Sequence, residues 1–213
     1  MELINSEICK NCGGFCCKKS GCDYYPQDFS DLSLSALLNI LEGGNISVVA
    51  LLKFEKLKNN KMVFSSLLYL RARNINRDVI DLFSMKTTCS MLTENGCSYD
   101  ESNRPSGGLN LIPEENYKCH PFLDPTKKIE EWESYQKVLR KAVKRITGRD
   151  VEDKLKEDIK NTYIDFFNGN VYGVNKLELD EIKKMLPLFN QVDPEMISEI
   201  IKSLGKSKVK KIR

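Results

Sequence analysis

The stretch EICKNCGGFCCKKSGCDYY, residues 7–25, places five of the chain's eight cysteines within fourteen positions. The other three follow much later, and all eight lie in the first 119 of 213 residues. Eight thiols is the number that two tetrahedral metal sites or two cubane clusters require. The fold of residues 1–119 therefore depends on whether these sulfurs bind each other, zinc or an iron–sulfur cluster. The candidate ligands are Cys9, Cys12, Cys16, Cys17, Cys22, Cys89, Cys97 and Cys119.

The spacing of the first cysteines favours a metal centre. Cys9-x2-Cys12 lets two sulfurs converge on one ion across a tight loop, and the glycine pair that follows allows a sharp turn. Because neighbouring side chains diverge, Cys16 and Cys17 are not expected to bind one ion in the same way. The run C-x2-C-x3-C-C differs from the ferredoxin, radical-SAM and zinc-ribbon patterns. The candidates are an iron–sulfur cluster, [4Fe–4S] first, or zinc; a redox dithiol at Cys9 and Cys12, or merely buried thiols or disulfides, are the alternatives.

Composition points to a globular protein with a core. Apolar residues make up 41% of the chain and charged residues 30%. No apolar run approaches the roughly 20 residues that a membrane span needs, so no membrane partner is expected. The first seven residues contain two acids and no apolar stretch, which argues against a signal peptide. We therefore expect a cytoplasmic protein, in a compartment where disulfides are disfavoured.

Charge is concentrated at the C-terminus. The chain carries a net charge of +3, and KSKVKKIR, residues 206–213, holds five of its 33 basic residues. Without this tail 28 basic residues face 30 acidic ones, so the body is near neutral. The tail is expected to be a solvated, disordered end. A nucleic-acid partner is not expected, because the tail is the only basic feature and no recognition motif accompanies it. The sequence leaves the oligomeric state open.

Hydrophobic periodicity predicts an α+β fold, with a small cysteine-rich metal-binding half of short strands and a helical C-terminal half. Residues 28–45 predict a helix capped by Asp31 or Ser33 and ended by Gly43-Gly44. Residues 46–57 are ambiguous and favour a helix, whereas 61–74 alternate as a strand and 78–84 fit a second short one. Residues 88–99 predict a hairpin turning at Asn95-Gly96. Residues 100–126 predict a long irregular stretch.

The chain becomes helical from about residue 127. Apolar stripes predict helices over 127–147, 150–168, 176–189 and 193–205, with Gly148 and Gly169 as stops. The first stripe runs from Ile129 through Trp132 to Ile146 and is expected to be core. We therefore divide the chain into a cysteine-rich domain over 1–126, a helical region packed on it over 127–205, and the tail over 206–213.

Four other residues are candidates for the site. Arg71, Arg73 and Arg104 lie near the cysteine half in sequence and are candidates for cofactor binding, where they would neutralise an anionic cluster or a substrate carboxylate. Surface ion pairs are the alternative reading for them. His120, the only histidine, directly follows Cys119 and is either a ligand, a proton shuttle or a loop residue. No catalytic residue is assigned.

The cysteine pattern resembles a known family. The motifs CKNCGGFCC, CSMLTENGC and the dipeptide Arg104-Pro105 resemble the YkgJ-like cysteine-cluster family, over residues 9–119. The resemblance implies a zinc- or iron-chelating domain, often labelled an iron–sulfur oxidoreductase. Gly108 stands where that family has a further cysteine, and Cys119, Cys22 or His120 would have to substitute. The opening is also similar, more distantly, to flagellin lysine N-methylase.

These observations lead to one expected function and two alternatives. The first is an iron–sulfur protein that transfers electrons or modifies a protein or peptide substrate. The second is a structural zinc module for protein interaction. The third is a protein lysine methylase-like enzyme. Whether the protein is an enzyme at all, and how many metal centres it holds, are left open by the sequence.

Overall fold

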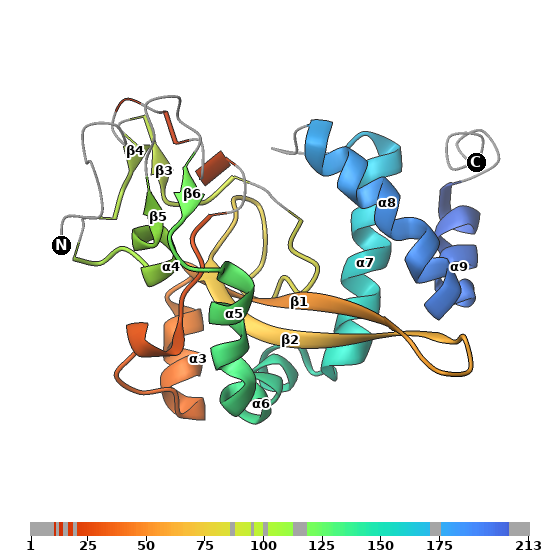
Figure 1. Ribbon diagram of the computed structural model, residues 1–213, viewed down its shortest axis with the longest axis horizontal. Coiled ribbons are helices and arrows are strands. Elements are labelled where there is room, and N and C mark those ends of the chain that lie inside the picture. The colour runs from red at the N-terminus through yellow and green to blue at the C-terminus, as the bar shows by residue number, and fades with distance from the viewer. Residues whose placement is uncertain are drawn as a thin grey trace.

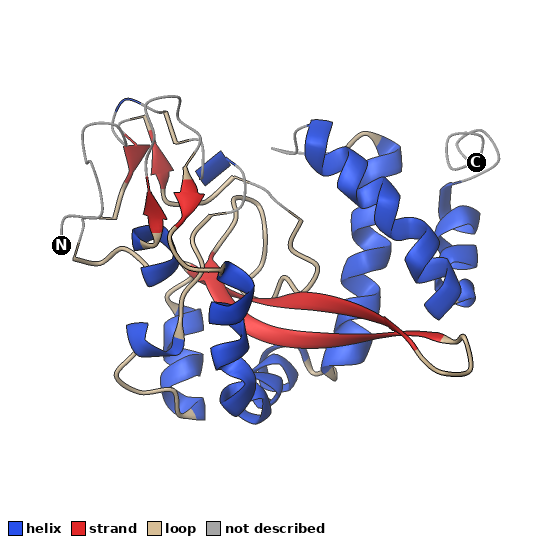
Figure 2. Cartoon of the chain, in the orientation of Figure 1, coloured by secondary structure: helices blue, strands red, loops and turns tan. Residues whose placement is uncertain are grey.

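The chain folds into an α+β structure whose helices and short strands gather around one long hairpin (Figures 1 and 2). The computed structural model describes residues 11, 13–14, 17–18, 21–85, 88–94, 96–99, 102–112, 119–170 and 176–204. Its elements are η1 (Pro26–Asp28), α3 (Leu34–Glu42), β1 (Ile46–Lys56), β2 (Met62–Ala72), β3 (Leu92–Thr93), β4 (Gly96–Cys97), α4 (Ser106–Leu109), β5 (Leu111–Ile112), β6 (His120–Pro121), α5 (Pro125–Glu130), η2 (Glu131–Tyr135), α6 (Gln136–Thr147), α7 (Val151–Asn168), α8 (Lys176–Val192) and α9 (Pro194–Leu204).

The β1–β2 hairpin is the backbone of the fold. Its two strands pair antiparallel over eleven residue pairs, from Ile46 opposite Ala72 to Lys56 opposite Met62. The strand predicted over 61–74 is confirmed as β2. The helix favoured over 46–57 is wrong, because those residues form β1.

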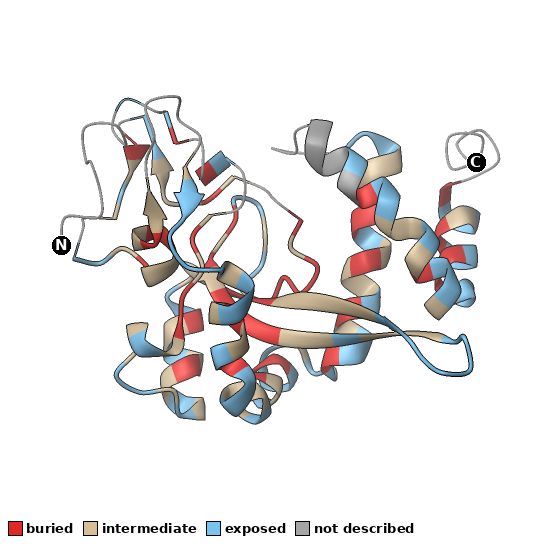
Figure 3. Ribbon diagram, viewed as in Figure 1, coloured by how far each residue is buried: buried red, intermediate tan, exposed pale blue. Residues whose placement is uncertain are grey.

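Burial on both faces of the hairpin explains the error. Val48 and Val49 are neighbours and point to opposite faces of the strand, yet they are 0% and 1% exposed. A strand that is covered on both sides loses the alternation of apolar and polar residues, and its apolar run then fits a helical period equally well. Figure 3 shows the buried residues concentrated in the half of the hairpin away from its turn.

The helix predicted over 28–45 is confirmed as α3. Ser33 caps it by accepting a hydrogen bond from the Ala36 amide, and Gly43 ends it. Leu37 and Leu41 are buried on its inner face. The helix packs against β1 and α6, so the first part of the chain contributes directly to the core.

The predicted helix over 127–147 is divided into three parts. α5 begins at Pro125, η2 interrupts the α-helical spacing over Glu131–Tyr135, and α6 runs on to Thr147. Gly148 follows with a φ of 71°, the left-handed conformation that glycine adopts readily. Trp132 is confirmed as core and is 0% exposed, whereas Ile146, expected on the same stripe, is 41% exposed. The change of helical pitch in η2 rotates the later part of the stripe relative to the earlier part.

The last three helices cover the part of the hairpin nearer its turn. α7 ends at Gly169 as expected, and α9 begins after Asp193, whose carboxylate accepts from the Met196 amide at 3.0 Å. α8 extends to Val192, three residues beyond its predicted end, and carries Pro187 within it. Edge-to-face aromatic contacts join α8 to both strands and to α7, through Phe189 against Phe54, Phe64, Phe83 and Tyr163.

The remaining strands are short and gather at one end of the molecule (Figure 1). β3 and β4 form the predicted hairpin, with Leu92 opposite Cys97; Asn95 of the predicted turn lies outside the described residues. β5 and β6 pair within the segment predicted to be irregular, which α4 also interrupts. Residues 78–84 make a single parallel bridge, Val48 with Ile80, rather than a full strand. We call the region of residues 11–24 and 88–121 the cysteine lobe.

One side chain completes the free edge of β2. The Gln136 side chain accepts a hydrogen bond from the Leu68 amide at 2.9 Å and donates one to the Leu68 carbonyl at 2.8 Å. A single carboxamide thus meets both backbone groups of an edge residue.

In the part of the chain that is described, no helix is long and apolar enough to cross a membrane.

Candidate metal centre

The start of the chain joins the hairpin at the end of β2. The Tyr24 amide donates to the Leu70 carbonyl and the Ala72 amide donates to the Cys22 carbonyl, each at 2.9 Å. These bonds flank an isolated antiparallel bridge between Asp23 and Arg71, so residues 22–24 lie alongside β2. Cys22 is buried there at 8% exposure.

Main-chain hydrogen bonds bring Cys89 to the opening cysteines. The Cys89 amide donates to the Cys17 carbonyl at 2.7 Å, and an isolated bridge pairs Cys89 with Asn74 just after β2. Gly21 fits closely here, since a Cβ on it would lie 3.3 Å from the Ala72 carbonyl oxygen and in ordinary contact, at 3.6 Å, with Cys89 Sγ. Its φ of 69° also favours glycine. The segments around residues 17, 22 and 89 therefore meet at one place.

Cys97 joins the same place through its side chain. Its thiol is hydrogen-bonded to the Cys17 thiol, and both the Tyr99 amide and the Arg104 side chain also bond to it. The Cys17 bond and the Arg104 charge outweigh partial burial and lower the pKa of Cys97 to about 6. The lowered pKa favours the thiolate form of Cys97, and the thiolate is the form that binds metals.

A pair of tyrosines lies beside the sulfurs. The hydroxyl groups of Tyr24 and Tyr99 are 2.8 Å apart. Burial, first, and the negative charges of Cys22, Cys89 and Cys97 raise the pKa of Tyr99, and burial is also the main cause of the raised pKa of Tyr24. Sequence reasoning missed both residues, although a signal existed: each tyrosine follows a cysteine by two positions.

Cys22 fills the space that a side chain on residue 108 would need. A Cβ built on Gly108 would lie 2.7 Å from Cys22 Sγ and 3.2 Å from Arg104 Cγ. Glycine is thus required here by contact with a sulfur.

The three candidate arginines have different surroundings. Arg71 has a structural role, because its Nε donates to Asp23 at 2.6 Å and its Nη2 donates to the Tyr69 hydroxyl at 2.7 Å. Arg73 donates to the carbonyls of Gly44 and Arg77. Arg104 is the one placed against a sulfur, and its buried Nε has no acceptor within the part of the chain that is described.

The other predicted ligands are Cys9, Cys12, Cys16, Cys119 and His120. Cys9, Cys12 and Cys16 lie outside the described residues. Cys119 immediately precedes β6, half-buried, and His120 is exposed where it pairs with Ile112. All five described cysteines, at 17, 22, 89, 97 and 119, are thiols rather than disulfide partners. Among the described residues alone, no group of three or more His, Cys, Asp or Glu side chains is arranged to hold a metal ion.

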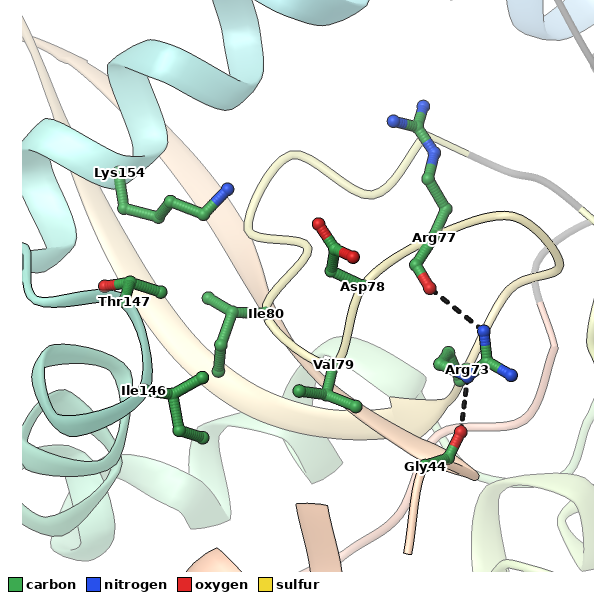
Figure 4. Close-up of a pocket in the computed structure, with 9 residues that line it drawn as sticks. All are labelled: Gly44, Arg73, Arg77, Asp78, Val79, Ile80, Ile146, Thr147 and Lys154. Carbon is green, nitrogen blue, oxygen red and sulfur yellow. Dashed lines mark hydrogen bonds between the residues drawn. The ribbon is translucent and has the colours of Figure 1, made fainter. Parts of the chain in front are cut away.

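Arg73 also lines a pocket together with residues 77–80 and the end of α6. Its volume is about 470 Å³, within the range of small-molecule sites. Figure 4 shows that the guanidinium of Arg73 is turned toward main-chain oxygens, at the edge of this pocket. Cationic and apolar side chains share the lining, which consists of Gly44, Arg73, Arg77, Asp78, Val79, Ile80, Ile146, Thr147 and Lys154.

Comparison with known proteins adds no relative. No family model, curated protein or solved structure matches the chain. The resemblance to the YkgJ-like family therefore stays an expectation from the motifs.

Proposed function

We propose that this protein binds an iron–sulfur cluster in the cysteine lobe and uses it for electron transfer or for modifying a protein or peptide. The observation that carries the proposal is that the segments holding Cys17, Cys22, Cys89 and Cys97 meet at one place, although these four side chains by themselves form no metal-holding group. These residues come from segments up to eighty positions apart in the chain. Reduced thiols fit a reducing compartment such as the cytoplasm.

The electrostatics around Cys97 support a thiolate centre. A cluster held by four thiolates is anionic, and burying it requires nearby donors or positive charge. Arg104 supplies both, since its charge lowers the pKa of Cys97 and its Nε is a buried donor with no acceptor within the described part of the chain. The Tyr99 amide is a second donor to the same sulfur.

The described thiols supply part of a ligand set. Cys16 is covalently next to Cys17, and Cys12 is two positions before Gly14, so these cysteines are the natural source of further ligands. When bound, an iron–sulfur cluster supplies one-electron chemistry. The chain's own part is to hold the thiolates and exclude water, which the burial of Cys17, Cys22 and Cys89 provides.

Metal and acid-labile sulfide analysis of anaerobically purified protein tests the proposal. Iron and sulfide in equal amounts, with a visible charge-transfer band, are the expected result. Zinc at one or two ions per chain without sulfide would refute the cluster and favour the structural zinc module. No bound metal of either kind would refute both.

Single substitutions then identify the ligands. Cys22→Ala, Cys89→Ala and Cys97→Ala are each expected to lower the metal content sharply. Ser98→Ala is a matched control, because Ser98 is exposed and adjacent to Cys97. Circular dichroism at the same time reports whether the helices are retained, since their core lies around Trp132 and Phe189. Metal content that is unchanged in all three cysteine variants would contradict the assignment.

A further inference from the structure

Helix α6 concentrates positive charge. Five of its twelve residues are lysine or arginine, and none is aspartate or glutamate. The neighbouring α7 carries three lysines against five acidic residues, so the two helices differ sharply in charge although the whole chain has a net charge of only +3. The tail over 206–213 is therefore not the only basic feature of this protein.

The charges of α6 lie on its outer face. Leu139, Ala142 and Val143 are each 0% exposed and pack into the core. Apart from Ile146 near its end, every exposed residue of the helix is cationic. We call this surface the basic face of α6, and it consists of Lys137, Lys141, Lys144 and Arg145.

Three of these cations form a row without counterions. Lys144 is neutralised by Asp150 at 3.0 Å, whereas Lys137, Lys141 and Arg145 make no ion pair with any residue that the structure describes. The three follow one another at intervals of four residues, so they are neighbours on the helix surface and span about 12 Å. Like charges at this spacing destabilise a helix, and an anionic partner would remove that cost.

The burial of the apolar face selects among anionic partners. A helix that lies in a membrane surface, or that fills the groove of a protein, uses its apolar face for binding. That face of α6 is occupied by the core. The basic face alone suits a partner with dense, regular negative charge, and duplex nucleic acid carries one charge per about 1.7 Å of its axis. A row of about 12 Å therefore faces several phosphates.

We propose that the basic face of α6 binds the phosphodiester backbone of a nucleic acid through Lys137, Lys141 and Arg145. The inference goes beyond the proposed function and does not depend on the metal centre, since α6 lies outside the cysteine lobe. With its inner side packed against the core, the helix lies across the backbone and reaches no base edges. Binding is therefore independent of base sequence and weakens steeply with salt.

Fluorescence anisotropy of a labelled 20-base-pair DNA duplex tests the inference, with an RNA duplex and a single strand of the same sequence to distinguish the possible sources of phosphate. The wild-type protein should bind at 50 mM salt, with log affinity falling against log salt at a slope of about −2.7 for three contacts. The triple variant Lys137→Gln, Lys141→Gln, Arg145→Gln should bind about tenfold or more weakly and with a flatter slope. Circular dichroism checks that the exposed substitutions leave the fold intact.

The turn of the β1–β2 hairpin offers a matched control. Lys56, Lys58 and Lys61 are exposed there and form no ion pair within the described part of the chain. The turn lies away from α6 (Figure 1). Replacing all three with Gln removes the same charge and should leave the affinity within about twofold. Equal losses in the two triple variants would show that only net charge matters and would overturn the inference.

Further outcomes identify a different partner or a different surface. Binding to vesicles of phosphatidylcholine and phosphatidylserine, or to poly-glutamate, without binding to any nucleic acid would overturn the inference. So would a loss of nucleic-acid binding on neutralising the tail over 206–213 while the α6 variant binds normally. The metal content of the α6 variant should equal that of the wild type, so failure of this inference leaves the test of the metal centre unaffected.

Discussion

The hairpin with its helices and the cysteine lobe are stabilised in different ways. The hairpin pairs eleven residues on each strand and buries side chains on both faces. The lobe contains strands of two residues each and glycines with positive φ at positions 13, 14, 21 and 96. Such short pairs have little independent stability in water. The comparison indicates that the helical part is held by apolar burial, whereas the lobe has few regular hydrogen bonds of its own and the proposed metal centre is what would stabilise it.

Removing the central core residue tests the first half of the comparison and has the largest expected effect. Trp132→Ala should lower the free energy of unfolding by about 3–5 kcal/mol, because a fully buried indole and its hydrogen bond to Tyr24 are lost. Urea denaturation followed by circular dichroism measures this. Ile146→Ala, at a partly exposed position on the neighbouring helix, should change the midpoint little. An equal loss in both variants would contradict the assignment of the core.

Adding a methyl group at Gly108 tests the second half of the comparison, the stability of the cysteine lobe. Gly108→Ala in metal-free protein should lower the free energy of unfolding by about 1–3 kcal/mol, because its Cβ would lie 2.7 Å from Cys22 Sγ. Cys22→Ala removes that sulfur, so the double variant should lose less stability than the two single variants summed. Purely additive losses would show that the two residues are not in contact.

Losing a helix cap should have a smaller effect, confined to the helical part. Asp193→Ala removes the acceptor for the Met196 amide at the start of α9 and its ion pair with Lys156. The expected loss is about 1 kcal/mol in the free energy of unfolding, with metal content unchanged. Asp193→Asn keeps a capping oxygen and should recover most of it. A fall in metal content would instead couple α9 to the cysteine lobe.

Titrating Cys97 should give the smallest change in stability, since this thiol is half exposed. Its native pKa of about 6 lies below the ordinary value of about 8.5, so the native state binds fewer protons than the unfolded state between these pH values. The stabilising contribution is therefore complete above about pH 8.5 and is lost as pH falls through about 6. Urea midpoints of metal-free protein should rise over this window.

Two variants check the origin of that pH dependence. Arg104→Gln should move the alkylation profile of Cys97 toward higher pH, because a positive charge that favours the thiolate is removed. Cys97→Ser should abolish this part of the slope. A slope that is identical in the wild type and in Cys97→Ser would assign it to other groups.

Sequence patterns predicted the elements with one buried face best. α3, α7 and α9 present single apolar stripes and explicit caps, such as Ser33, Gly169 and Asp193, and they form as expected. β1 was mistaken for a helix because it is buried on two faces. The break at η2 escaped prediction because nothing in the apolar spacing around Trp132 marks a change of pitch.

The candidate site was predictable in part. Cysteine spacing was sufficient to nominate Cys17, Cys22, Cys89 and Cys97, which the fold brings to one region. The sequence offered no basis for distinguishing Arg104 from Arg71, since both are single arginines near the cysteines. Only the fold shows that Arg104 contacts the Cys97 thiol, whereas Arg71 pairs with Asp23. The relation of Cys22 to Gly108 likewise depends on folding that a linear pattern does not encode.

The carboxamide of Gln136 has a consequence for how copies of this protein meet. An exposed strand border invites pairing with another chain, and such pairing leads to fibrous assemblies. Gln136 engages both main-chain groups of Leu68, so that stretch of β2 has nothing left to offer an incoming strand. Gln136 on α6 thereby blocks pairing of β2 with a strand of another chain at Leu68.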